Sequence, residues 1–154
     1  MGNKEGAVEN YRGFATKREA RILAVQCLYN IALIPEDIKS ADAIISDLLA
    51  YGTTQTSVDE KYFTTLVNTT YSHIKLLHKT IQEFLANDWT ISRLPETVQA
   101  ILIVAVAEML YCYDTPINVI FNEYIEIAKI FNHDGEAGFI NGVLDKISKK
   151  YPRR

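Results

Sequence analysis

The sequence predicts an all-α protein of about six helices, and three observations support this. Apolar residues recur at helical spacing, no segment alternates apolar and polar residues between turn signals, and the 48% apolar and 23% charged content is typical of globular chains. A length of 154 residues fits one domain. We expect a flexible basic arm over 1–15 and a single helical domain over 16–150, with halves at about 16–88 and 93–150 that meet near 87–95.

Two helices are expected to follow the arm. The first begins at Thr16 and ends at Pro35, because proline cannot continue a helix. Its apolar stripe comprises Ala20, Leu23, Ala24, Cys27, Leu28, Ile31 and Ile34. The second helix covers about 36–50 and buries Ile38, Ala41, Ile45, Leu48 and Leu49.

A third, long helix is expected after a polar connector over 53–56. Ser57 and Glu60 have the spacing of a capping box, in which each side chain satisfies a backbone N–H at the helix start. Apolar residues then recur at helical spacing as far as Leu85, and Asn87–Asp88 interrupts the pattern.

The second half contains the most apolar segment of the chain. Apolar residues cover every face between Ala100 and Ala107, which predicts a central, fully buried helix, with Pro95 in its first turn. Thr115 is a candidate N-cap with Pro116 at the first helical position. The last two helices are expected over about 116–132 and 136–150.

The net charge of −3 conceals an uneven distribution. Residues 1–21 and 146–154 hold ten of the sixteen basic residues and three of the nineteen acidic ones, so these ends sum to +7 and residues 22–145 to −10. A basic pole on an acidic body indicates a polyanion at the pole and a cationic partner elsewhere. Two solvated tails would explain the same charges, and both interpretations stay open.

The sequence contains no motif for catalysis. It lacks the GxSxG, Walker and GxGxxG patterns that anchor acyl, phosphoryl and hydride transfer. His73 and His78 lie about 140° apart on a helix and cannot hold one metal from one face. The two cysteines, Cys27 and Cys112, fall in apolar patterns and are interpreted as buried side chains. We expect no enzymatic activity, no cofactor and no metal.

No apolar run approaches the ~20 residues of a membrane span. The start of the chain, Met1 to Gly6, has no apolar stretch for a signal peptide. We therefore expect a cytoplasmic protein without membrane contact.

The start of the first helix carries groups suited to RNA. Its cations are Lys17, Arg18 and Arg21, and steps of three and four residues lead on to Tyr29, with Gln26 adjoining. Guanidinium groups pair with phosphates, amides read base edges, and tyrosine rings stack on bases. The alternative is that Gln26 and Tyr29 border the core and that the cations only solvate a surface.

Four motifs follow one another along the chain. They read Ala20-Arg-Ile-Leu-Ala-Val-Gln26-Cys-Leu-Tyr29, Trp89-Thr-Ile-Ser-Arg93-Leu94, Asn122-Glu123-Tyr-Ile-Glu126-Ile-Ala128-Lys129 and Phe139-Ile-Asn141-Gly142-Val-Leu-Asp145. In this order and spacing the chain resembles the NusB family of bacterial transcription antitermination factors, over about residues 16–147.

The resemblance implies about six to seven helices in two three-helix bundles packed roughly perpendicular. It also implies a non-enzymatic factor that binds boxA-type leader RNA of ribosomal RNA operons together with the NusE ribosomal protein, and that acts on elongating RNA polymerase. The implied RNA contacts are Lys17, Arg18, Arg21, Gln26, Tyr29 and Phe139. Taken alone, Phe139 fits a core position equally well.

Three positions depart from the pattern of the family. Glu19 and Ile103 stand where arginine is frequent, and Gly138 stands where lysine is common, so we expect weaker RNA binding alone and more dependence on a NusE-like partner. An alternative function is a helical adaptor that docks a basic ribosomal protein and has little RNA affinity of its own. Homodimer formation is a further open alternative.

Overall fold

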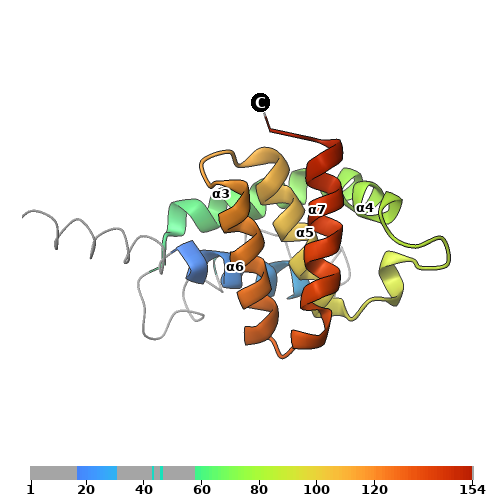
Figure 1. The fold of residues 1–154 in the computed structure, drawn as a ribbon. Helices are drawn as coiled ribbons and strands as arrows, with labels where there is room; N and C mark the ends of the chain where they lie inside the picture. Colours follow the sequence, from blue (N-terminus) through green and yellow to red (C-terminus); the bar gives the residue numbers. More distant parts are fainter. Residues whose placement is uncertain (1–16, 31–42, 44–45, 47–57, 154) are drawn as a thin grey trace, which may run out of the picture. The chain divides into compact units, whose positions relative to one another are not determined.

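The computed structural model describes residues 17–30, 43, 46 and 58–153, and within them every regular element is a helix and no strand occurs (Figure 1). The predicted all-α class is therefore confirmed. The predicted arm over 1–15, the helix over about 36–50, the connector over 53–56 and the capping residue Ser57 lie outside the described residues.

The chain divides into two compact units, residues 1–65 and 66–154. The boundary falls inside helix α3 (Glu60–Ser72). The expected single domain over 16–150, with halves that meet near 87–95, stays a prediction.

Unit 1 contains the helix over residues 17–30 and the start of α3. In the first helix, the members of the predicted apolar stripe that the structure describes are buried: Ala20, Leu23, Ala24, Cys27 and Leu28. The predicted start of α3 is too early by two residues. The helix begins at Glu60, and Asp59 caps it, since its Oδ1 accepts a hydrogen bond of 3.0 Å from the backbone N–H of Tyr62.

The long helix predicted from Ser57 to Leu85 is interrupted at His73, where α3 ends and α4 (Ile74–Glu83) begins. The imidazole Nδ1 donates to the carbonyl of Thr69 at 2.8 Å, and the ring stacks on that of Tyr111 with centroids 4.0 Å apart. A ring contact with a residue 38 positions later in the chain thus accompanies the break, which no glycine or proline marks.

Helix α5 (Glu96–Tyr111) is the centre of unit 2, because it contacts α4, α6 (Ile117–Ile130) and α7 (Ala137–Lys150). Its side chains are buried at residue 98 and throughout 100–109, which confirms the predicted buried helix. It has 16 residues, and none of the described helices is long and apolar enough to cross a bilayer.

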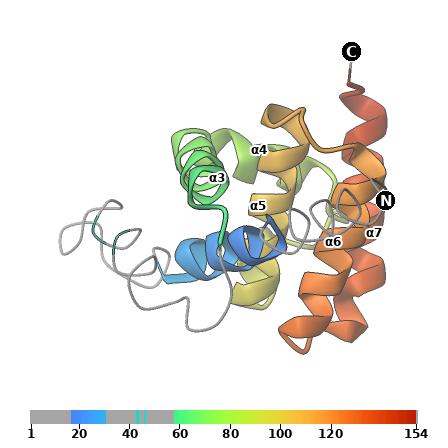
Figure 2. The ribbon, with the colours of Figure 1, turned by 90° about the vertical axis from the view of Figure 1, so that its left-hand side faces the viewer.

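Helices α6 and α7 lie side by side in both views (Figures 1 and 2). Asn132, at φ 61°, ends α6, and the N–H of His133 returns to the carbonyl of Ala128 at 2.8 Å in the manner of a Schellman cap. The short 3₁₀ helix η2 (Asp134–Glu136) then leads into α7. The predicted cap of α6 is wrong, since Pro116 and not Thr115 occupies the N-cap position.

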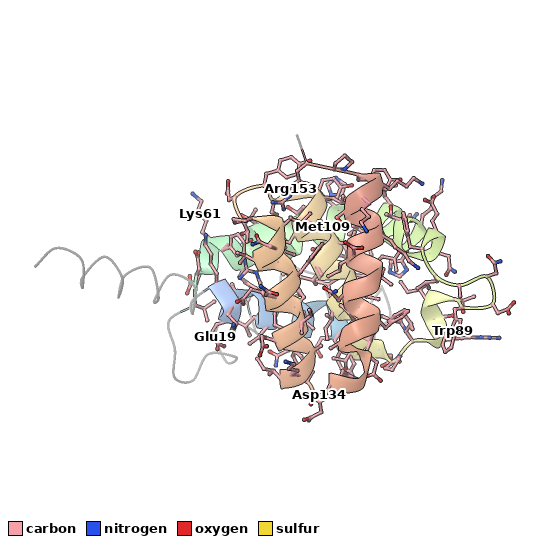
Figure 3. The ribbon with its side chains drawn as sticks, in the orientation of Figure 1. Glu19, Lys61, Trp89, Met109, Asp134 and Arg153 are labelled. Carbon is pink, nitrogen blue, oxygen red and sulfur yellow. The ribbon has the colours of Figure 1, made fainter. Side chains whose placement is uncertain are left out.

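In the loop between α4 and the 3₁₀ helix η1 (Ile91–Arg93), the Gln82 side chain makes two hydrogen bonds. The Gln82 amide donates to the carbonyl of Trp89 at 2.7 Å and accepts from the N–H of Ile91 at 2.9 Å. Trp89 is 51% exposed and projects away from the helices of unit 2 (Figure 3).

Candidate nucleic-acid interface

Three of the predicted contact residues share one partly exposed face of the helix over residues 17–30. Gln26 and Tyr29 follow Arg18 by eight and eleven residues, so at about 100° per residue they lie about 80° and 20° around the helix from it. All three side chains are partly exposed. We call these residues the Arg18 face. It combines a guanidinium, an amide and an aromatic ring.

The other two predicted cations on this helix meet a ring of α3. The Lys17 Nζ lies 5.2 Å and the Arg21 Cζ 5.5 Å from the centroid of the Tyr62 ring. Arg21 is only 1% exposed, whereas Lys17 is partly exposed. The first helix and α3 are thus joined by cation–π contacts within unit 1, and Arg21 belongs to this junction.

A signal for the burial of Arg21 was present in the sequence. Leu28 was assigned to the apolar stripe, and it follows Arg21 by seven residues, which places the two about 20° apart on the helix. The row traced from Arg18 to Tyr29 also passes through Val25, which is fully buried.

Glu19 lies next to the Arg18 face. It precedes Gln26 by seven residues, or about 20° of helix, and is partly exposed. Its carboxylate therefore places a negative charge beside this face.

Phe139 belongs to unit 2 and lies in the first turn of α7. Its ring is 41% exposed, so the interpretation of Phe139 as a core residue is wrong. At Gly138 an added Cβ would meet no atom within 4 Å, so the backbone at this position leaves open space for a side chain. Ile103 is 6% exposed, so this neutral side chain belongs to the buried core of α5.

Three of the C-terminal cations of the predicted basic pole have partners within unit 2. The Lys149 Nζ pairs with Asp145 at 2.9 Å and the Lys150 Nζ with Glu83 at 3.2 Å. Arg153 donates to backbone carbonyls at the end of α5. Sequence reasoning missed this role. The available signal was the position of arginine three residues after a helix that contacts α5.

Two features describe the chemistry that the described residues offer. The described residues contain no group of three His, Cys, Asp or Glu side chains that could hold a metal ion. Burial raises the pKa of the Cys27 thiol to about 12, so this group is protonated and unreactive at neutral pH.

Fold and face together define the class: a small all-helical protein with a cationic and aromatic helix surface. The chain belongs to the NusB family, since its residues 18–149 match the family of that description.

Two relatives and one solved structure show the extent of the similarity. The chain is 33% identical over 148 residues to the transcription antitermination protein NusB of Rickettsia massiliae (strain Mtu5), covering 89% of this chain and 94% of the relative. It is 38% identical over 137 residues to the protein of the same name from Geobacter sp. (strain M21), covering 86% and 94%. A chain in the crystal structure of antitermination factors NusB and NusE in complex with dsRNA superposes with a TM-score of 0.76 at 23% identity, covering 87% of this chain and 96% of that chain.

Proposed function

We propose that this protein is a non-enzymatic transcription antitermination factor that binds single-stranded boxA-type RNA from the leaders of ribosomal RNA operons. The observation that carries the proposal is the similarity to proteins named transcription antitermination protein NusB, which extends over nearly their whole length. A NusB structure of the same fold was solved with NusE and dsRNA, which supports RNA as the class of ligand.

The Arg18 face supplies the chemistry for a single strand. The Arg18 guanidinium pairs with phosphate, the Gln26 amide reads a base edge, and the Tyr29 ring stacks on a base. Lys17 adds a second phosphate contact from the junction with Tyr62. In this proposal Arg21 orients the start of the helix through its contact with the Tyr62 ring, because its own side chain is buried.

Phe139 is proposed as a further stacking ring. An exposed phenyl group in the first turn of a helix gives up little conformational freedom on stacking, and nothing in its side chain prefers one base over another.

The proposed protein partner is a NusE ribosomal protein, and the joint complex acts on elongating RNA polymerase. The charge of −10 over residues 22–145 suits a basic ribosomal protein. Self-association competes with this assembly if the homodimer covers the same surface.

The test is fluorescence anisotropy with a labelled boxA-type RNA, with and without the NusE partner. Arg18→Gln should weaken RNA binding and reduce the slope of log K against log salt by about 0.7, the contribution of one phosphate on single strands. Lys129→Gln, an exposed cation on α6, is the matched control and should leave both unchanged. If Arg18→Gln bound RNA as tightly as the wild type, the assignment of the Arg18 face as the RNA-binding surface would be wrong. If RNA binding required the partner and did not depend on Arg18, the alternative function of a helical adaptor for a basic ribosomal protein would be favoured.

A further inference from the structure

Unit 2 contains a hollow of about 540 Å³ at the end of α5, far in the chain from the Arg18 face. Its walls come from α4, the last turn of α5 and the segment that follows α7. The lining residues that the argument uses are Leu76, Thr80, Tyr111, Tyr113, Tyr151 and Arg153. We call it the Tyr113 hollow.

One wall of the hollow is fixed by Arg153. Its guanidinium donates to the carbonyls of Met109 at 3.2 Å, Cys112 at 3.2 Å and Glu108 at 3.4 Å, and also to the carbonyl of Thr115. These carbonyls lie at and beyond the end of α5, where a helix leaves its last acceptors without partners in the helix. Figure 3 shows Arg153 beside Met109 at the end of unit 2 from which the C-terminus leaves.

The rings of the hollow are backed by cations and still exposed. The Arg153 Cζ lies 5.3 Å from the centroid of the Tyr113 ring, and the Lys150 Nζ lies 5.4 Å from that of Tyr151. Tyr113 is nevertheless 68% exposed and Tyr151 42%. A ring held by a cation on one face keeps its other face for a planar partner.

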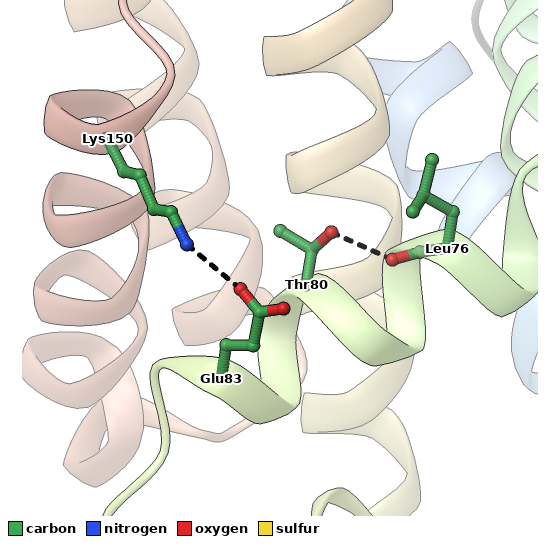
Figure 4. Close-up of polar contacts among 4 residues, drawn as sticks. All are labelled: Leu76, Thr80, Glu83 and Lys150. Carbon is green, nitrogen blue, oxygen red and sulfur yellow. Dashed lines mark hydrogen bonds and ion pairs between the residues drawn. The ribbon is translucent and has the colours of Figure 1, made fainter.

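The charged side chains that line the hollow are cations, and one of them is paired with a carboxylate of α4. The lining includes Lys150 and Arg153 and no carboxylate. The Lys150 Nζ reaches Glu83 on α4, close to the lining residues Thr80 and Leu76 (Figure 4). Two exposed lysines lie one turn away on the same helices, four residues before Glu83 on α4 and four residues before Lys150 on α7. The described residues provide no ion pair for either of them. These are Lys79 and Lys146.

We infer that the Tyr113 hollow is a second RNA-binding site, which takes an unpaired nucleotide with its base on Tyr113 and its phosphate near Lys146 and Lys150. This inference rests on the proposed function. A nucleotide joins a planar ring to an anion, and so matches both the open ring face and the charge of the hollow. An acidic peptide would match the charge alone.

The test compares the full chain with two variants and two matched controls by fluorescence anisotropy, using a labelled 20-nucleotide single-stranded leader RNA. Tyr113→Ala should bind about tenfold more weakly, the loss expected for one base–aromatic stack. Lys146→Gln should reduce the salt slope by about 0.7. The controls are Tyr71→Ala, an exposed tyrosine of α3 outside the hollow, and Lys129→Gln on α6, and both should bind within twofold of the wild type. A cooperative urea transition and a helical circular dichroism spectrum like that of the wild type establish that each variant is folded.

Photo-crosslinking gives a second readout that does not depend on affinity. RNA bound in the hollow should crosslink to the peptide that carries Tyr111 and Tyr113. If RNA binding responds to Arg18→Gln while Tyr113→Ala binds normally and no crosslink forms there, the second site is wrong and the proposed function stands. If the wild type binds no RNA even when the NusE partner is present, both are wrong. If Tyr113→Ala weakens binding of a labelled poly-glutamate peptide and not of RNA, the occupant is an acidic peptide and the inference is overturned.

Discussion

Replacing Arg153 by alanine should destabilise unit 2, because one side chain satisfies four backbone carbonyls at the end of α5. A partly buried cation at a helix C-terminus contributes about 1–2 kcal/mol, and a cation–π contact such as that with Tyr113 adds about 0.5–1 kcal/mol. We therefore expect Arg153→Ala to lower the free energy of unfolding by about 2 kcal/mol. At about 3 °C per kcal/mol for a chain of this size, the Tm should fall by about 6 °C.

Urea denaturation followed by circular dichroism measures this change. Arg153→Lys keeps the charge without the planar fork, so we expect about half of the loss. The control is Lys149→Ala, which removes an exposed i, i+4 pair with Asp145 and should cost less than about 0.5 kcal/mol. A loss for Arg153→Ala no larger than that of the control would refute the capping role.

Two further substitutions and one labelling experiment have measurable outcomes. Glu19→Gln should raise RNA affinity about threefold by removing a carboxylate beside the bound phosphates, and unchanged affinity in an anisotropy titration would contradict its placement. Gln82→Ala should release the loop, so the Ile91 amide should exchange with deuterium about tenfold faster, and equal protection would show that the loop has other supports. Since burial raises the pKa of Cys27 to about 12, only about one thiol in ten thousand is ionised at pH 8, and the folded chain should react with a disulfide reagent at Cys112 alone until denaturant is added.

The same thiol, Cys27, should make the free energy of unfolding fall at alkaline pH. Cys27 ionises near its ordinary pKa only when the chain is unfolded, so ionisation draws the equilibrium toward the unfolded state. Stability from this group is complete below about pH 8 and declines as the pH rises above about 9. Cys27→Ala should lose this part of the alkaline decline, which urea midpoints at pH 8 and pH 10 would show.

The helices of unit 2 were predictable because their signals are local. A run of apolar residues on every side marks α5 as buried, and the predicted bounds of α6 and α7 agree with the structure to within two residues. The break at His73 was not predictable, because its ring contact is with Tyr111 and no proline or glycine stands nearby. A contact between distant residues leaves no trace in a local pattern.

The candidate site was predictable only in part. Composition located the cations but not their partners, so Lys149, Lys150 and Arg153 were assigned to an open basic pole although each has a partner in unit 2. Spacing by threes and fours found the side of the helix that carries Arg18 and Tyr29. Spacing alone could not separate that side from the adjoining buried sector, since the buried Val25 lies only about 20° around the helix from Arg18.

The segment 151–153 forms one side of the Tyr113 hollow and also ties down the end of α5. Any occupant of the hollow is therefore thermodynamically linked to the docking of this segment: it binds only the docked state, and docking in turn protects the end of α5. The melting temperature of the chain should then rise with the concentration of such an occupant. Release of residues 151–153 would lower affinity without altering a single contact residue of the Arg18 face.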